Sequence, residues 1–130
     1  MTVRPRPTSP HLSVYRFTLT MTLSIVHRIT GGALYFGTLL VVWWLIAAAS
    51  SPNAYAGIGS FMSSFVGRLL LFGYTWALMH HMLGGMRHLV WDTGNGLEKH
   101  TSTRLAWANL AGSIVLTILI WIAGYAARGG

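Results

Sequence analysis

Residues 29–67 of the chain read ITGGALYFGTLLVVWWLIAAASSPNAYAGIGSFMSSFVG and contain no charged side chain. A helix that crosses a membrane needs about 20 mainly apolar residues. This stretch is therefore long enough for one transmembrane helix followed by a connection. The residues at 50–53 and 57–60 favour turns, so we expect the connection at about 50–60.

Two further charge-free stretches follow, of 18 residues between Arg68 and Arg87 and of 23 residues between Arg104 and Arg128. All three stretches are continuous apolar runs without the strict alternation of membrane β-strands. The sequence therefore predicts an all-α integral membrane protein with three transmembrane helices, at about 24–49, 61–90 and 105–126. Trp76 is too far inside the second predicted helix to face the lipid headgroups, and we expect it inside the bundle.

The composition of this 130-residue chain excludes several classes of protein. Hydrophobic residues make up 53% and charged residues 8%, whereas the surface of a soluble domain requires about 25% charged residues. The absence of cysteine excludes a disulfide scaffold and any iron–sulfur cluster held by cysteine. No G-x-G-x-x-G fingerprint and no pair of carboxylates is present, so we expect no catalysis by the chain alone.

Positive side chains are distributed unevenly between the predicted connections. They occur in the N-terminal segment, 1–23, and in the second connection, 91–104, but not in 50–60. The net charge of +7 is thus typical of a membrane protein with a positive cytoplasmic side, and we expect no nucleic-acid partner. We predict a cytoplasmic N-terminus and a periplasmic C-terminus. No signal peptide is recognisable, so the mature chain is expected to begin near Met1.

A first group of polar residues lies at the start of the first predicted helix. Ser24, His27 and Arg28 are spaced so that they share one helical face. This face can direct hydrogen-bond donors at one small polar molecule near the cytoplasmic surface. Alternatively, His27 and Arg28 only mark the membrane border, with their polar ends reaching the headgroups.

A second group lies near the end of the second predicted helix, in the run HHMLGGMRH at 80–88. His81, Gly84, Gly85 and His88 form one helical stripe, and His80 lies about 100° around the helix. Glycines allow a flat, bulky group to approach, and imidazole is a haem iron ligand. Alternatively, His81 forms a hydrogen bond across a helix interface and the glycines serve close packing.

The positions of the histidines constrain a haem site further. The first predicted helix beyond Arg28 and the third predicted helix contain no histidine. A haem with two imidazole ligands would therefore need its second ligand from another chain.

Three blocks of sequence together resemble the cytochrome b556 subunit family of succinate dehydrogenase, respiratory complex II. They are RPTSPHLSVY at 6–15, SIVHRITG at 24–31, and the pattern His81-x-x-x-Gly85-x-Arg87-His88 with Asp92 four residues later. The order and spacing of all three blocks match the family, and they extend to the end of the second predicted helix.

This resemblance implies a single anchor domain, 1–130, in the bacterial inner membrane, surrounded by lipid. A second small membrane subunit completes the helix bundle, and an iron–sulfur subunit and a flavoprotein subunit dock on it. The implied function is electron transfer from succinate to ubiquinone. A cofactor-free structural anchor and an anchor of the fumarate reductase type remain the alternatives.

The resemblance also implies roles for individual residues. His81 would be the axial iron ligand of a haem b that is shared with the partner subunit. Ser24 and Arg28 would contact ubiquinone, and His27 and Arg28 would lie near the haem propionates. Arg87 and His88 lie toward the same cytoplasmic end, where we expect them to meet the propionates as well. The family pattern assigns no role to His80.

Overall fold

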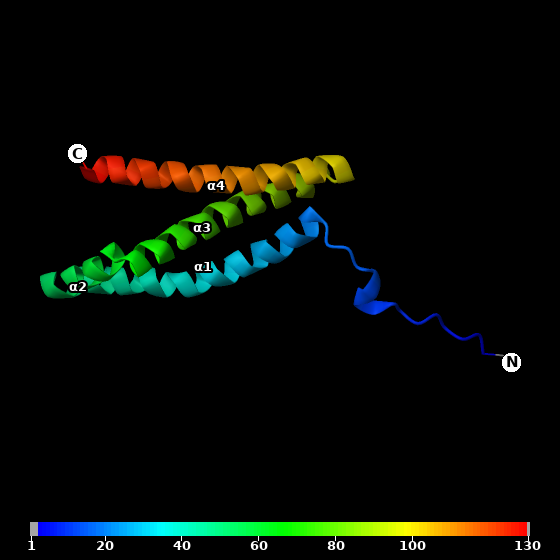
Figure 1. The fold of residues 1–130 in the computed structure, drawn as a ribbon, viewed down its shortest axis with the longest axis horizontal. Coiled ribbons are helices and arrows are strands. Elements are labelled where there is room, and N and C mark those ends of the chain that lie inside the picture. The colour runs from blue at the N-terminus through cyan, green and yellow to red at the C-terminus, as the bar shows by residue number, and fades with distance from the viewer. Residues whose placement is uncertain (1–2, 130) are drawn as a thin grey trace.

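The computed structural model describes residues 3–129, and all regular elements within this range are helical (Figure 1). A 3-10 turn at His11–Val14 precedes four α-helices, which are α1 (Leu19–Ser50), α2 (Pro52–Ser63), α3 (Phe65–Asp92) and α4 (Lys99–Gly129). The all-α prediction is confirmed. Met1, where we expect the mature chain to begin, lies outside the described residues.

The three long helices run along one another, with α3 between α1 and α4 (Figure 1). The beginning of α1 and the connection between α3 and α4 lie at one end of the bundle. The short helix α2 and the C-terminus lie at the other end, far from the N-terminal segment. Each end of the bundle is thus built from segments that are distant in sequence.

Two of these helices, α1 and α4, are each long and apolar enough to cross a membrane. Helices α2 and α3 pass the same test only as a pair, which is bent by 79° at its break. The 28 residues of α3 alone extend for about 42 Å, more than the roughly 30 Å of a hydrocarbon core. The described chain therefore has two clear spans, and a third if the bent pair is one broken span.

The prediction of turns at 50–60 is wrong, because helix α2 occupies most of this segment. Only Ser51 separates α1 from α2. The Ser51 side chain accepts a hydrogen bond of 3.1 Å from the Ala54 backbone N–H, and Pro52 is the first residue of α2. A capping serine followed by proline starts a helix as readily as it forms a turn.

The sharp joint between α2 and α3 depends on Gly67. This residue is buried, and a Cβ atom on it would overlap with the carbonyl oxygen of Phe61. Ser64 caps the new helix by accepting a 3.1 Å hydrogen bond from the Gly67 N–H. The bend is therefore built from a cap and from the absence of one side chain.

The helix ends differ from the predicted ranges mainly by being longer. Helix α1 begins at Leu19 rather than near 24, because the Thr18 hydroxyl caps it by accepting from the Met21 N–H. Helix α4 extends beyond 105–126 at both ends, and α3 runs from Phe65 to Asp92 where we predicted 61–90. The polar residues of the first group therefore lie inside α1 and not at its start.

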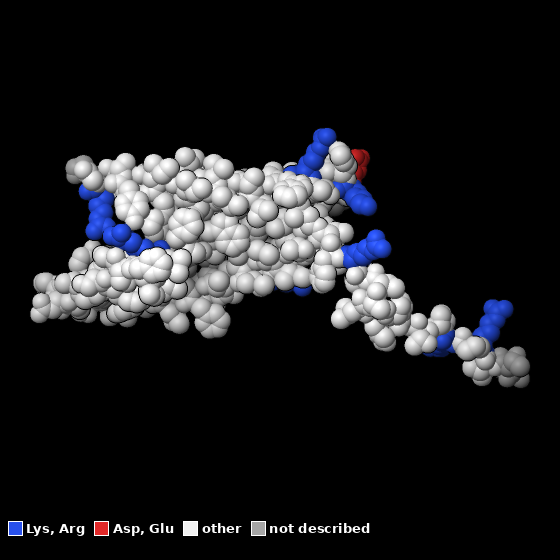
Figure 2. Space-filling view, viewed as in Figure 1, with Lys and Arg blue, Asp and Glu red and all other residues white. Residues whose placement is uncertain are grey.

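Small residues fill the contacts between helices, while large apolar side chains face outward. Ala77, Ala106, Ser113 and Thr117 are buried, whereas Phe36, Leu39 and Trp43 of α1 are among the many exposed apolar side chains. Figure 2 shows charged side chains near the two ends of the bundle and a wide uncharged region between them. This distribution is typical of helices that pack through small residues and face lipid or other membrane subunits.

Candidate cofactor site

The ring of His81 points from α3 toward α1 and is held there by the α1 backbone. Its Nδ1 atom lies 3.2 Å from the carbonyl oxygen of His27 and 3.4 Å from the hydroxyl of Thr30. A carbonyl oxygen can only accept, so Nδ1 carries the proton and Nε2 keeps its lone pair. A metal-ligating imidazole is oriented in the same way, by a carbonyl on its other nitrogen. The ring of His81 is half-buried.

The ring of His27 fills the space that Gly84 leaves on α3. It stacks on His81 with 4.1 Å between ring centroids and 13° between ring planes, and it meets the edge of His88 at 5.2 Å. Gly84 is buried, and a Cβ atom on it would overlap with Cδ2 of His27. Gly84 is therefore required for the close contact between α1 and α3.

The two glycines of the predicted stripe thus have different surroundings. Gly84 is covered by this chain's own His27, whereas a Cβ atom on Gly85 would meet no described atom within 4 Å. On α1, a Cβ atom on Gly31 would lie 3.0 Å from Cε1 of His81. The open part of the stripe lies at Gly85, and the absence of a side chain at Gly31 makes room for the ring of His81.

Arg87 is the most unusual residue of this region, because its charge is buried. Its exposed fraction is 4%, and its Nε and Nη1 atoms have no hydrogen-bond partner among residues 3–129. Its guanidinium lies 5.0 Å from the ring of Trp91. Nε2 of His27 is likewise buried without a partner in the same range. Unpaired buried donors cost about 1–3 kcal/mol each, and more when charged, so these groups fit an anionic ligand.

The other residues of the first polar group are more accessible. Ser24 is half-buried and Arg28 is exposed, one turn apart on α1. In the part of the chain that the structure describes, no hydrogen bond joins either side chain to another residue. His88 is also exposed, and its ring packs edge-on against Trp91 at 5.1 Å. The structure therefore brings the rings of His27, His81 and His88 into contact, places Arg87 beside Trp91, and leaves Ser24 and Arg28 free at the same end.

His80 points to a different side of α3, toward α4, and is completely buried. Its Nδ1 atom lies 3.2 Å from the amide nitrogen of Asn109 and 3.5 Å from the hydroxyl of Ser113. Its ring stacks on Trp76 with 5.0 Å between centroids. His80 is therefore enclosed within this chain, where a group bound from outside cannot reach it.

The partners of His80 on α4 were missed by the sequence reasoning. Asn109, Ser113 and Thr117 are buried, and they follow one another at intervals of four residues. Such a polar stripe in an apolar helix indicates a helix contact with hydrogen bonds. The spacing was thus available as a signal for the α3–α4 interface.

The residues present fit a haem better than a bare metal ion. Within residues 3–129, no three His, Cys, Asp or Glu side chains converge to hold a metal. A haem needs from the protein only axial ligands and partners for its propionates. One oriented imidazole, a buried unpaired guanidinium and an open glycine match that requirement.

Comparison with known proteins identifies the family of the chain. Residues 2–120 match the family described as succinate dehydrogenase/fumarate reductase transmembrane subunit. The chain belongs to this family. The resemblance that the three sequence blocks indicated is therefore confirmed, and so is the membrane class of the chain.

Several members of the family with assigned names are similar to the chain. It is 47% identical to the succinate dehydrogenase cytochrome b556 subunit of Paracoccus denitrificans over 117 residues, which cover 90% of each chain. It is 40% identical to the b556 subunit of Rickettsia prowazekii, over 90% of this chain and 91% of the relative. The mitochondrial cytochrome b560 subunit of Sus scrofa is 41% identical over 71% of this chain and 56% of its own length.

Proposed function

We propose that the chain is the cytochrome b anchor subunit of a succinate dehydrogenase complex in a bacterial inner membrane, where it holds haem b and helps to form the ubiquinone site. The observation that carries this proposal is the hydrogen bond from His81 Nδ1 to the His27 carbonyl, which leaves Nε2 as a ligand. Similarity to named cytochrome b subunits supports the same conclusion. The chain itself performs no chemistry on succinate.

In the haem site, each residue of the chain has a distinct task. His81 would hold the haem iron through Nε2, and the His27 carbonyl and Thr30 hydroxyl fix the tautomer and orientation of its ring. The buried guanidinium of Arg87 offers two unpaired donors to a propionate, in charge-assisted hydrogen bonds. When bound, haem b supplies a one-electron redox centre.

The remaining polar groups complete the propionate region. Nε2 of His27 is buried without a partner in the described chain, and Arg28 and His88 are exposed at the same end of the bundle. Neither α1 beyond Arg28 nor the apolar part of α4 contains another histidine. The second small membrane subunit therefore supplies the other axial ligand, and it completes the three-helix bundle.

In the quinone site, Ser24 and Arg28 donate to one carbonyl oxygen of ubiquinone. Reduction increases the negative charge on this oxygen, which a hydroxyl and a guanidinium stabilise. Arg28 is exposed and Ser24 half-buried, so a quinone can reach both from the side of the docked iron–sulfur subunit. We expect Ser24→Ala to lower quinone reduction while succinate oxidation by a soluble dye persists.

Thr22→Ala is the matched control for this substitution. Thr22 is exposed on the same helix, and its hydroxyl already donates to the Thr18 carbonyl at 3.0 Å. Its loss should leave both activities unchanged. An equal fall of both activities in the Ser24 variant would assign Ser24 to assembly instead of quinone binding.

We also propose the orientation of the chain in the membrane. The N-terminal segment and residues 93–98 face the cytoplasm, and α2 lies at the periplasmic surface with α3 as the continuing span. Single cysteines at Asn53 and Asn95, both exposed, should react with membrane-impermeant reagents from opposite sides. Reaction of both from one side would contradict this topology.

The proposed function is tested by purifying the complex through a tag on this chain. We expect a flavoprotein, an iron–sulfur protein and a second small membrane protein to copurify, with a reduced haem absorbance band. The chain expressed alone should bind little haem, because it lacks the second ligand. A complete complex without haem absorbance would favour the structural anchor, and faster fumarate reduction than succinate oxidation would favour the fumarate reductase type.

A further inference from the structure

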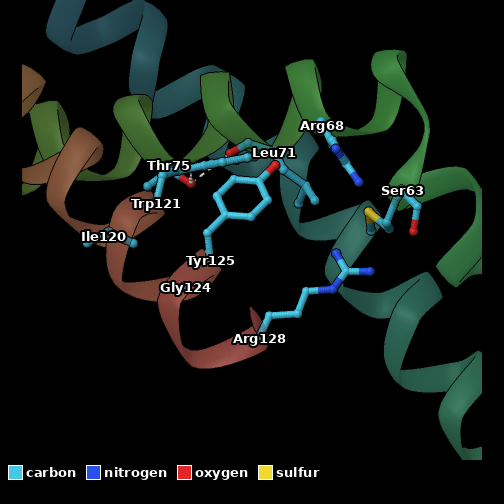
Figure 3. Close-up of a pocket in the computed structure, with 10 residues that line it drawn as sticks. Ser63, Arg68, Leu71, Thr75, Ile120, Trp121, Gly124, Tyr125 and Arg128 are labelled. Atoms are coloured by element: carbon cyan, nitrogen blue, oxygen red, sulfur yellow. Dashed lines mark hydrogen bonds between the residues drawn. The ribbon is translucent and has the colours of Figure 1, made fainter. Parts of the chain in front are cut away.

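A cavity of about 370 Å³ opens between α3, α4 and the end of α2, as Figure 3 shows. It lies at the end of the bundle that is distant from the candidate cofactor site. Arg68 at its rim precedes His81 by 13 positions on α3, which corresponds to about 20 Å along the helix. The cavity therefore belongs to neither the haem nor the quinone region.

Two guanidinium groups lie at the rim of this cavity. Arg68 is in the first turn of α3 and Arg128 is in the last turn of α4. Figure 3 shows both groups on the side of the cavity near Ser63. The guanidinium of Arg68 also lies 6.0 Å from the ring of Tyr125.

No acidic side chain of this chain lies beside these two charges. The sequence contains only two acidic residues, Asp92 and Glu98. Both lie at the other end of the bundle, Asp92 as the last residue of α3 and Glu98 directly before α4. Figure 2 shows the acidic side chains only at that end. Two like charges at the rim of one cavity repel each other, and an anion between them would relieve this repulsion.

The remaining walls of the cavity are suited to a lipid. Leu71 and Ile120 provide apolar surface, and Trp121 and Tyr125 are the aromatic residues typical of the membrane–water boundary. The indole N–H of Trp121 donates to the Thr75 hydroxyl at 3.2 Å, which joins α4 to α3 beside the cavity. The site is thus held in place by the helix contact itself.

We propose that this cavity binds the phosphate headgroup of an anionic phospholipid, in the leaflet on the side of α2 and the C-terminus. Helix ends lie at the depth of the lipid phosphates, and guanidinium binds phosphate oxygens in pairs. The volume exceeds the needs of a bare phosphate, and its apolar walls continue toward the acyl region. Two guanidinium groups with no acidic side chain beside them favour an anionic lipid over a zwitterionic one.

The proposal is tested by native mass spectrometry of the intact detergent-purified complex. The probes are phosphatidylglycerol, phosphatidylcholine and inorganic phosphate. We expect one phosphatidylglycerol to bind more tightly than phosphatidylcholine, and millimolar phosphate not to displace it. Each arginine near the surface contributes a factor of about five, so replacing both should weaken binding by about 25-fold.

Three variants make the result specific to the cavity. Arg68→Gln with Arg128→Gln removes both charges, and Arg4→Gln with Arg6→Gln removes the same charge from the exposed N-terminal segment. Only the first pair of substitutions should weaken the binding of the most tightly bound lipid. Arg68→Lys with Arg128→Lys keeps the charges and should retain most of the binding, which separates loss of charge from misfolding.

Three results would overturn the proposal. Unchanged phosphatidylglycerol binding in the double glutamine variant would place the lipid elsewhere. Displacement by inorganic phosphate would identify a site for a free anion. Loss of a partner subunit from the same variant, without loss of lipid from the rest of the complex, would show that a partner's carboxylate pairs with the two arginines.

Discussion

The two sides of α3 carry adjacent histidines in contrasting surroundings. On the side that faces α4, His80 is fully buried and is bonded to Asn109 within the chain. On the side that faces α1, His81 is half-buried and bonded through one nitrogen only. We call the surroundings of His80 the closed region and the surroundings of His81 the open region.

The buried atoms that lack a hydrogen-bond partner indicate where the chain requires a partner from outside. The closed region leaves His80 Nε2 and Asn109 Oδ1 without partners in the described chain, and both belong to neutral groups when the imidazole is unprotonated. The guanidinium of Arg87, farther along α3, is charged and unpaired in the described chain, which is far more costly in an apolar layer. A partner from outside the described residues is therefore required for the guanidinium of Arg87.

The largest effect is expected at Gly84, where the ring of His27 leaves no space for a side chain. Gly84→Ala would force His27 away from α3, and overpacking of this kind costs about 1–3 kcal/mol. We expect lower thermal stability and less haem per purified complex. Gly73→Ala on the same helix meets no described atom within 4 Å and should leave both quantities unchanged. Equal behaviour of the two variants would contradict the close contact of His27 with Gly84.

A smaller effect is expected from the buried charge of Arg87. Arg87→Leu removes a positive group near the proposed propionates, which makes the reduced haem less favourable. We expect the midpoint potential to fall by a few tens of mV, since about 1.4 kcal/mol corresponds to about 59 mV for one electron. Arg104→Leu is the control, because Arg104 is exposed. An unchanged potential at full haem content in redox titrations would separate Arg87 from the haem.

The smallest effect is expected in the closed region. Asn109→Ala removes the closer of the two α4 partners of His80 Nδ1. Hydrogen bonds between membrane helices contribute about 0.6 kcal/mol on average, so the thermal midpoint should fall slightly. The haem spectrum should not change. A changed spectrum in this variant would mean that the closed region also takes part in the cofactor site.

The spacing of residues predicted the apolar segments and the stripe of His81. It did not predict the different surroundings of His80 and His81. The charge-free runs predicted three apolar segments, and the stripe that begins at His81 predicted one chemically distinct face. Spacing alone could not decide which adjacent histidine faces α1, since that depends on the rotation of α3 in the bundle. The contact between His27 and His81 joins residues 54 positions apart, which no local pattern encodes.

Other differences came from signals that have two interpretations. Ser51 followed by Pro52 is a turn signature and also a helix start, and the structure has the helix. The four-residue spacing of Asn109, Ser113 and Thr117 is visible in the sequence and indicates a helix contact. The spacing alone does not identify which helix makes that contact. The 79° bend at Ser64 depends on packing around Gly67 that the residue order does not specify.

The central claim is that His81 belongs to the cofactor and His80 to the fold. It is tested most directly by reduced absorbance spectra of the complete complex with His81→Ala and with His80→Ala. We predict that the haem band is lost or shifted in the His81 variant and retained in the His80 variant. Loss of the band with His80→Ala, together with an unchanged band with His81→Ala, would contradict the assignment.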